Sequence, residues 1–409
     1  MPPTSENPFK PGAGHMPPYL AGRDAEQKRF AEILRQSVIT ENLVLTGLRG
    51  VGKTVLLETL KPIARSKGWL WTGTDMSESA GISEERLAMR LITDISVITS
   101  PMLHMTSPLP AIGFRQESDN VIQPVDFNHL MAVFGSSPGL VVDKLRSLLM
   151  GLWNALEGKV AGVVFAYDEA QILNDHSRDG EFPLSMLLEL FQSIQKQGIP
   201  FLLVLTGLPI LFPKLVEART YSERMFHVMF LSQLTPAESR EAIIRPTQKE
   251  DCPLRFTEDS VQSIINLSCG YPYFIQFICK EVFDVWLSKL GASEPPSIPE
   301  QAIISKLDND FFAARWDKAT DRERDLLTVV SRLPNADAEF SVNDIVMLAQ
   351  MQLRKPFSAS QVNQMLGRLT AKGLIYKNRH GRYLFAVPLM SKFIRRQSDH
   401  DGDLFGVAR

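Results

Sequence analysis

The feature that most constrains the fold is a glycine-rich segment, Gly47–Thr54, which lies between an apolar run, Leu43–Leu45, and a helix-forming stretch. The segment reads Gly-Leu-Arg-Gly-Val-Gly-Lys-Thr. Glycines let the backbone turn tightly, so that several N–H groups point at one anion. The positive end of the following helix faces the same anion. The spacing and its flanks predict a phosphate-binding loop in an α/β domain.

The polar residues of this loop suit a nucleoside triphosphate and a metal ion. Lys53 reaches the β- and γ-phosphates in such loops, and the hydroxyl of Thr54 ligates Mg²⁺. The predicted cofactors are therefore ATP or ADP and Mg²⁺. The residues expected to contact the nucleotide here are Gly47, Arg49, Gly50, Val51, Gly52, Lys53, Thr54 and Val55.

Composition excludes several other classes of protein. Hydrophobic residues make up 44% and charged residues 22% of the 409 residues, which is ordinary for a globular protein of two or three domains. The three cysteines, Cys252, Cys269 and Cys279, are too few and too far apart for a zinc site or a disulfide framework. The longest apolar stretch, 199–212, is too short to span a bilayer. We expect no signal peptide, because the N-terminus lacks a basic region followed by an apolar core. We expect a cytoplasmic protein without a membrane partner.

Apolar strands alternate with amphipathic helices along residues 19–233, which predicts a doubly wound parallel sheet covered on both faces. The stretch 99–138 is irregular and rich in Pro, Ser and Gly, and we interpret it as an insertion in which Ala111–Arg115 pairs with Asn120–Val125. The expected strands are 43–45, 69–72, 160–167, 201–205 and 225–231, and the expected helices are 25–35, 83–97, 140–156 and 185–197.

Proline and helix-start signals divide the rest of the chain. Residues 1–18 contain six prolines and are expected to form an extended arm rather than a packed element. Helix-forming stretches near 236–246, 257–268 and 273–289 predict a small helical lid. The expected plan is an arm at 1–18, the α/β core at 19–233, the lid at 234–290, a linker with a bridging helix at 291–314, a C-terminal domain at 315–397 and a tail at 398–409.

A second signature follows the strand Val163–Tyr167, which ends in the acidic pair Asp168-Glu169. After a phosphate loop, Asp168 in this position would hold Mg²⁺, and Glu169 would orient and deprotonate an attacking water. The next predicted strand ends at Thr206, whose hydroxyl would help to position that water. These residues predict hydrolysis in addition to binding.

Two arginines, Arg219 and Arg224, precede the last predicted strand of the core. In ring-forming ATPases an arginine at this place projects from one subunit onto the γ-phosphate held by its neighbour. We choose Arg224 for this role, with two solvated surface arginines as the alternative. The choice implies a homo-oligomer that forms with ATP.

These motifs together resemble an AAA+ ATPase of the origin-recognition and archaeal-initiator branch, and the chain is also similar to the signal-transduction ATPases with numerous domains. The resemblance covers about residues 19–290 and implies that Tyr19 and Leu20 line the adenine pocket. It also implies that the turn ending in Pro272 brings the lid against the nucleotide. One position departs from the pattern, because Tyr273 stands where many relatives carry a lid arginine. The matching residues are Tyr19–Glu26, Gly47–Thr54, Val163–Glu169, Thr206, Arg224 and Gly270–Pro272.

The C-terminal domain is predicted to be a winged helix, because three capped helices precede a hairpin that turns at residues 378–381. Residues 354–396 contain ten basic side chains and no Asp or Glu, in a chain of net charge −2. A basic winged helix favours duplex DNA, with the third helix in the major groove and the hairpin near phosphates. The predicted DNA contacts are Gln361, Gln364, Arg368 and Lys372 on the helix and Lys377, Arg379 and Arg382 on the hairpin.

Three functional hypotheses remain open at this point. The first is an ATP-dependent switch that binds duplex DNA through its winged helix. The second is a signalling ATPase whose winged helix docks a protein effector. The third is a nucleotide-binding scaffold with little turnover, which the tyrosine at the lid-arginine position favours.

Overall fold

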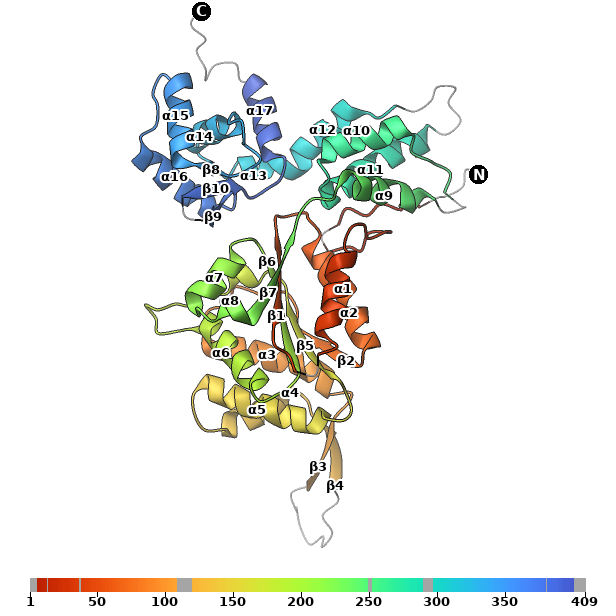
Figure 1. Cartoon of the computed structure of the whole chain (residues 1–409), viewed down its shortest axis with the longest axis vertical. Coiled ribbons are helices and arrows are strands. Elements are labelled where there is room, and N and C mark those ends of the chain that lie inside the picture. The colour runs from red at the N-terminus through yellow and green to blue at the C-terminus, as the bar shows by residue number, and fades with distance from the viewer. Residues whose placement is uncertain are drawn as a thin grey trace, which may run out of the picture. The chain divides into compact units, whose positions relative to one another are not determined.

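The computed structural model describes residues 6–12, 14–36, 38–108, 120–248, 252–289, 297–379 and 381–400. It divides into two compact units, shown in Figure 1. The first, the sheet unit, comprises Arg23–Thr46 and Lys53–Phe230. The second, the helical unit, comprises Met1–Gly22, the loop segment Gly47–Gly52 and Leu231–Arg409.

The sheet unit is built on five strands in the order β2-β5-β6-β1-β7. Every residue of strands β1, β5 and β6 is buried and most of them are apolar, as expected for a parallel sheet covered on both faces. The register sets Leu45 beside Thr206 and Tyr167 beside Leu205. The predicted doubly wound α/β fold is confirmed. The strands are β1 (Asn42–Gly47), β2 (Trp69–Thr72), β5 (Gly162–Tyr167), β6 (Phe201–Gly207) and β7 (Phe226–Leu231).

Helices cover both faces of this sheet, with α1 and α2 on one side and α3, α5 and α6 on the other (Figure 1). Ser83 caps α3 by accepting a hydrogen bond from the Arg86 amide at 3.3 Å. Short helices connect the later strands. The bounds are α1 (Asp24–Ile33), α2 (Lys53–Ser66), α3 (Glu84–Thr99), α5 (Val141–Leu156), the 3₁₀ turn η1 (Ala170–Ile172), α6 (Pro183–Gln195), α7 (Leu211–Ala218) and α8 (Ser222–Met225).

The insertion is more regular than its composition predicts. Strand β4 (Asn120–Pro124) pairs antiparallel with β3 (His104–Pro108), and the predicted partner Ala111–Arg115 lies outside the described residues. A helix follows, α4 (Phe127–Ser136), so the expectation of an irregular stretch is wrong there. Asp126 caps α4 through the His129 amide at 2.9 Å, a local signal that the Pro- and Ser-rich surroundings obscured.

The helical unit contains the lid, a link and the C-terminal domain. The predicted winged helix is present as four helices and a three-stranded sheet in the order β8-β10-β9. The lid helices are α9 (Pro236–Ile244), the 3₁₀ turn η2 (Arg245–Thr247), α10 (Glu258–Ser268) and α11 (Pro272–Ser288); the link is α12 (Glu300–Leu307), the π-helix η3 (Asp308–Ala313) and α13 (Ala314–Trp316). The winged helix comprises α14 (Asp321–Ser331), β8 (Phe340–Ser341), α15 (Val342–Gln352), α16 (Ala359–Ala371), β9 (Ile375–Arg379), β10 (Arg382–Phe385) and α17 (Met390–His400).

Lid, link and winged helix share one hydrophobic core. Its centre is a chain of aromatic rings in which Phe274 of the lid lies 6.0 Å from Phe312 of the link, and Phe312 stacks at 5.2 Å on Phe393 of α17. Helix α17 is absent from the predicted plan, and the expected boundary at residue 397 falls inside it. The lid and the winged helix are therefore packed through the link as one body.

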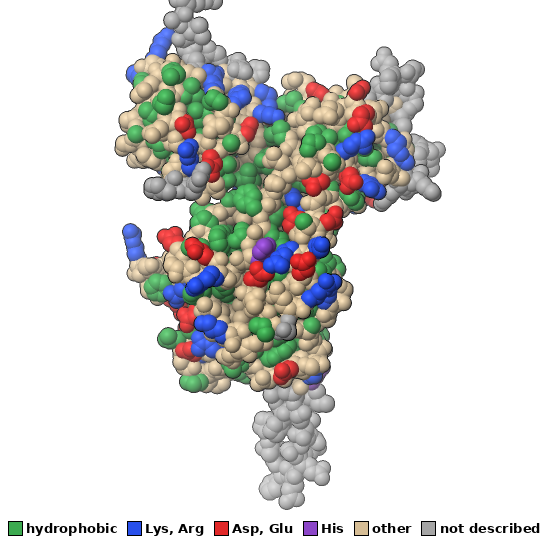
Figure 2. Space-filling view, viewed as in Figure 1, with side chains coloured by type: hydrophobic (Ala, Val, Ile, Leu, Met, Phe, Trp, Pro, Cys, Tyr) green, Lys and Arg blue, Asp and Glu red, His purple; other side chains and the backbone are tan. Residues whose placement is uncertain are grey.

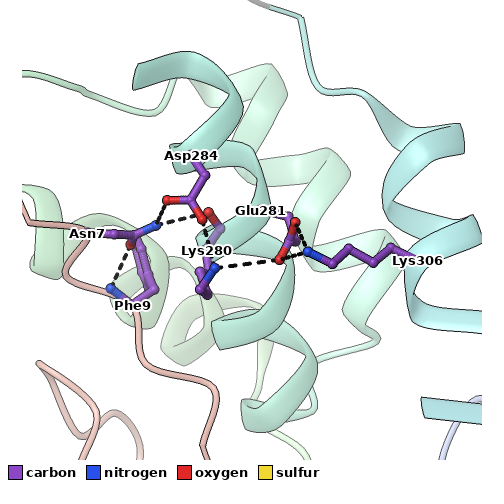
Figure 3. A network of polar contacts seen from close by, with 6 residues as sticks. All are labelled: Asn7, Phe9, Lys280, Glu281, Asp284 and Lys306. Carbon is purple, nitrogen blue, oxygen red and sulfur yellow. Dashed lines mark hydrogen bonds and ion pairs between the residues drawn. The ribbon is translucent and has the colours of Figure 1, made fainter. Parts of the chain in front are cut away.

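The N-terminal arm is also part of this core, so the expectation that it is unpacked is wrong for residues 7–10. Phe9 is 2% exposed and meets Phe256 and Phe283 edge-on. The Asn7 amide donates to the Lys280 carbonyl at 3.0 Å and to Asp284 at 2.7 Å. Figure 3 shows this network. One aromatic side chain between prolines suffices to anchor an arm, because burying it contributes about 1.5–3 kcal/mol.

Candidate functional site

The loop between β1 and α2 has the backbone that its glycines predict. Gly50 and Gly52 adopt φ of 80° and 89°, a left-handed region that favours glycine. At Gly47 a Cβ atom would lie 2.4 Å from the Leu231 carbonyl oxygen, so a side chain is excluded there. Helix α2 begins at Lys53, directly after the loop. The strand–loop–helix arrangement expected of a phosphate loop is therefore present.

The two residues predicted to hold a metal ion, Thr54 and Asp168, contact each other within the sheet unit. Thr54 Oγ1, in the first turn of α2, donates to Asp168 Oδ2 at 2.5 Å, and Asp168 follows the last residue of β5. Asp168 is only 4% exposed, and its other oxygen accepts the Glu169 amide at 2.7 Å. Across the described residues no three His, Cys, Asp or Glu side chains could together hold a metal ion. Thr54 and Asp168 are the residues that could hold a Mg²⁺ here, an ion that usually keeps several water ligands.

Glu169 is held in an unusual backbone conformation. Its φ is 52°, a left-handed value that costs a residue with a Cβ about 1–2 kcal/mol. Strained residues of this kind concentrate at functional sites. The exposed Glu169 carboxylate accepts a hydrogen bond from the Gln171 side chain. The position and strain fit the predicted general base.

Gln171 is a residue that the sequence reasoning missed. Its Nε2 donates to Glu169, and its Oε1 accepts the amide of Leu208 at 3.0 Å. Lys214 donates to the Gln171 carbonyl at 2.6 Å. Gln171 therefore ties the acidic pair to the end of β6, and its place two residues after that pair is the only sequence signal for it.

Thr206 lies near the end of β6, beside Leu45 of β1. It is wholly buried, and within the described structure its Oγ1 has no hydrogen-bond partner. A buried hydroxyl without a partner costs about 1–3 kcal/mol. The position agrees with the predicted role toward the attacking water, but full burial means that neighbouring side chains must move before water reaches it.

A third carboxylate, Asp75, joins this edge of the sheet and was not predicted. Asp75 forms an isolated parallel bridge with Asp168. Burial raises the pKa of Asp75, and the charges of Asp168, Glu169 and Glu58 raise it further. The signal lies in the topology, because Asp75 follows β2, and β2 is the neighbour of β5 in the sheet. The local excess of negative charge suits a divalent cation.

The two arginines before β7 differ in their partners. Arg219 donates to Glu189 at 3.3 Å, whereas Arg224, on the four-residue α8, is exposed. Within the described part of the chain, Arg224 makes no ion pair. Of the two, Arg224 is the side chain available to a second subunit.

The lid turn predicted to face the nucleotide contacts the loop segment inside the helical unit. Pro272 is the first residue of α11, and the next amide, that of Tyr273, donates to the Gly50 carbonyl at 3.1 Å. Tyr19 and Leu20, the predicted adenine-pocket residues, are half-buried. The Tyr19 hydroxyl donates to Glu241 of α9 at 2.9 Å. The tyrosine is thereby attached to the lid.

The predicted DNA contacts on the winged helix separate into engaged and exposed side chains. Lys372 forms a 2.6 Å ion pair with Glu323, which is 1% exposed. The Gln361 side chain accepts the Ser358 amide as part of the α16 cap, and Arg382 lies 3.7 Å from Asp344. Three of the predicted contacts are exposed and make no ion pair in the described structure, namely Gln364, Arg368 and Lys377. The Arg379 side chain lies outside the described residues.

The last three basic residues of the run also have internal partners. Lys392 donates to the Cys269 sulfur at 2.9 Å, Arg395 to the Ser331 carbonyl at 2.5 Å, and Arg396 to Asp308 at 2.9 Å. On the face of the winged helix seen in Figure 2, basic and acidic side chains are interspersed. The basic run in the sequence is therefore partly structural.

Comparison with solved structures identifies the fold. The Aeropyrum pernix ORC2 protein matches with a TM-score of 0.53 in its ADPNP-ADP complexes and 0.52 in its ADP form, at 12% and 14% identity, over 96% of this chain and 98% of that one. The chain has the AAA+ fold of the archaeal origin-recognition proteins. The Aeropyrum pernix ORC1 protein in complex with DNA matches at a TM-score of 0.46 and 16% identity, over 94% of each chain. Residues 309–394 match the model of a domain of unknown function, DUF8462. No curated protein matches the chain.

The strand order agrees with the AAA+ assignment. Counted along the core alone, the five parallel strands run 2-3-4-1-5, which is typical of AAA+ domains. The phosphate loop follows the first core strand and Asp168-Glu169 the third. No helix in the described ranges is both long and apolar enough to cross a bilayer.

Proposed function

We propose that this AAA+ chain binds ATP with Mg²⁺, hydrolyses it slowly, and uses the nucleotide state to control a winged helix that binds duplex DNA. The strongest support for nucleotide binding is the hydrogen bond between Thr54 and Asp168, next to a loop in which Gly50 and Gly52 have the left-handed φ expected of a phosphate loop. Thr54 and Asp168 would hold the metal, and Lys53 the β- and γ-phosphates. The metal would neutralise charge on the phosphates.

Glu169 is the proposed general base. Its carboxylate would take a proton from the attacking water, and Gln171 would fix its orientation. Thr206 would orient the water from the end of β6. Arg224 would reach the γ-phosphate held by a neighbouring subunit and so couple turnover to a homo-oligomer.

Two substitutions test binding and hydrolysis separately. Lys53→Ala is expected to weaken binding of both ATP and ADP, measured with a fluorescent nucleotide. Glu169→Gln is expected to leave binding within about threefold and to lower phosphate release about 10²-fold or more. Glu157→Gln, which changes an exposed carboxylate at the end of α5, is the matched control. Unchanged turnover in Glu169→Gln would reject the base and favour a scaffold without turnover.

The DNA part of the proposal is supported by the winged helix and by the exposed side chains of Gln364, Arg368 and Lys377. Arg368 lies on α16, the helix expected to enter the major groove, and Lys377 on the hairpin strand β9. Charge reversal at both positions in the full chain should weaken binding to a duplex about tenfold or more at low salt. Lys159→Glu, at an exposed lysine of the sheet unit, is the control.

A protein effector is the second candidate, and one observation favours it. Met347 and Met351, one turn apart on α15, are 58% and 78% exposed, which is unusual for large apolar side chains. The full chain carrying Met347→Ser and Met351→Ser separates the two candidates. Duplex binding that is unaffected by the methionine changes and lost with the charge reversals supports DNA.

A further inference from the structure

The link between lid and winged helix is connected to the phosphate loop through Tyr273 of the lid, within the helical unit. Tyr273 is hydrogen-bonded to Gly50, and a Cβ on Gly50 would lie 3.2 Å from the Tyr273 Cβ. The Tyr273 ring packs at 5.1 Å on Phe311. Phe311 belongs to the π-helix η3, a rare conformation that is frequent at functional sites. The loop therefore contacts the first turn of the lid helix α11, and that turn contacts the π-helix.

Arg315 extends this succession. It lies two residues after the π-helix, its guanidinium sits 4.2 Å over the Phe311 ring, and it donates to the Phe311 carbonyl. The side chain is thus held in place by the residue that touches Tyr273. Burial lowers the pKa of Arg315, and the charge of Arg49, in the phosphate loop, lowers it further. The contacts from Arg315 to Phe311, from Phe311 to Tyr273 and from Tyr273 to Gly50 bring this guanidinium toward the loop that carries Arg49, in agreement with the shift.

Neither arginine has a carboxylate partner among the described residues. Burial raises the pKa of the neighbouring Tyr273, the charge of Arg315 lowers it and the charge of Asp310 raises it, whereas no carboxylate contributes to the pKa shift of Arg315. Two like charges held together without a counter-ion are unfavourable in the free protein. They become favourable when a polyanion lies between them, and Arg49 stands in the loop expected to hold phosphates.

We propose that Arg315 binds the terminal phosphate of a bound nucleoside triphosphate together with Arg49, and so replaces the lid arginine whose place Tyr273 occupies. The proposal rests on the proposed nucleotide binding and adds a residue from the link to it. It also gives the signal a route, because Phe311 is 5.0 Å from Phe312, which stacks on Phe393 of the winged helix. A phosphate contact at Arg315 would act directly on the link, and the link packs against helix α17 of the winged helix.

The test compares ADP with a non-hydrolysable ATP analogue in competition for a fluorescent nucleotide on the full chain. The wild-type protein is expected to prefer the triphosphate. Arg315→Ala should lose about tenfold in affinity for the ATP analogue and less than about threefold for ADP, since a charge-assisted contact to phosphate is lost only with the triphosphate. Arg324→Ala is the matched control, because Arg324 also lies over a link ring, Trp316, at 5.4 Å.

Arg315→Gln guards against a folding defect, since it removes the charge but keeps a side-chain amide that can donate to the Phe311 carbonyl. It should lose the triphosphate preference as Arg315→Ala does, with an unchanged Tm. Equal affinities of wild type and both variants for the ATP analogue, or equal losses for both nucleotides, would overturn the proposal. A wild-type protein that binds neither nucleotide would overturn the proposed function itself, a distinguishable result.

Discussion

At the scale of single residues, the acidic edge of the sheet depends on one side chain outside any recognised motif. Gln171 contacts the Glu169 carboxylate with its nitrogen and the Leu208 amide with its oxygen. Glu169 itself is strained, with φ of 52°. Loss of the amide would leave the Glu169 carboxylate without a side-chain hydrogen bond in the described structure, although Asp168 and the loop would be intact.

Gln171→Ala is therefore expected to lower kcat about tenfold, because small misplacements of a catalytic group are costly. Nucleotide affinity should stay within about twofold. Phosphate release under saturating ATP measures the first quantity and nucleotide titration the second. Gln197→Ala, at an exposed glutamine beyond α6, is the control. A variant as fast as wild type would show that Glu169 needs no such support.

Lys372 and Arg368, both predicted from the sequence to meet DNA, should respond differently to substitution. Lys372→Ala removes the cation from Glu323, which is 1% exposed, and should lower the free energy of unfolding by about 1–3 kcal/mol. Arg368→Ala, at an exposed site, should change it by less than about 0.5 kcal/mol. Urea unfolding of both variants decides this, and equal stability of the two would contradict the structural role of Lys372.

At the scale of elements, the first turn of α14 and the N-terminal arm both make contacts that should stabilise the folded chain. Glu323 completes the capping box of α14 by accepting the Thr320 amide at 2.9 Å. Burial alone would raise the pKa of Glu323, but the hydrogen bonds from Lys372 and Thr320 outweigh it and hold the pKa below the usual 4.5. This cap therefore makes a pH-dependent contribution to stability.

The sign of that dependence follows from the lowered pKa. Because the folded pKa lies below the unfolded value, the contribution is complete above about pH 4.5 and is lost as pH falls through the folded pKa. The free energy of unfolding, measured from pH 7 down to pH 3, should fall less steeply in Glu323→Gln than in the wild type. Parallel curves for the two proteins would refute this assignment.

The arm should stabilise the lid through a single ring. Phe9→Ala empties a pocket formed with Phe256 and Phe283 and is expected to cost about 3 kcal/mol in the unfolding of the helical unit. Lys10→Ala, at the exposed neighbour, should cost less than about 0.5 kcal/mol. Thermal unfolding followed by tryptophan fluorescence, to which Trp286 near Phe256 contributes, reports the difference. Equal midpoints would mean that the arm does not strap the lid.

At the scale of the whole molecule, the helical unit joins the loop segment to the winged helix, as the proposed switch requires. One hydrophobic core joins the arm, the lid, the link and the winged helix. Aromatic contacts run from Tyr273 beside the loop, through Phe311 and Phe312, to Phe393 on α17. A change at the loop has a packed route to the winged helix that does not depend on a flexible linker.

The proposed role of Arg224 requires two copies of the chain, which mixing can test. Arg224→Ala and Glu169→Gln should each be nearly inactive alone. Mixed in equal amounts with ATP, they should regain part of the wild-type phosphate release, because some interfaces then combine an intact Glu169 with an intact Arg224 of the neighbour. Arg219→Ala in place of Arg224→Ala is the comparison, since Arg219 is paired with Glu189. Failure of mixing to restore turnover would place Arg224 outside a neighbour's site.

Features that depend on a few consecutive residues could be predicted from the amino-acid sequence alone. The loop Gly47–Thr54, the strand ending at Asp168 and the capping boxes at Thr320, Ser341 and Ser358 are local, because their interactions span at most a few positions along the chain. Local patterns were also enough to predict the five strands of the core, since each is mostly apolar.

Contacts between residues that are far apart in the sequence could be found only in the tertiary structure. Asp75 joins Asp168 because β2 neighbours β5, and Lys372 is engaged because α16 packs on α14, where it reaches a glutamate 49 positions away. Arg315 is held near the phosphate loop because Phe311 of the π-helix packs on Tyr273, whose amide donates to the Gly50 carbonyl. Such contacts are set by how elements pack, and no spacing along the chain records them. The phosphate loop could therefore be predicted from its own residues, whereas its packed connection to the winged helix could not.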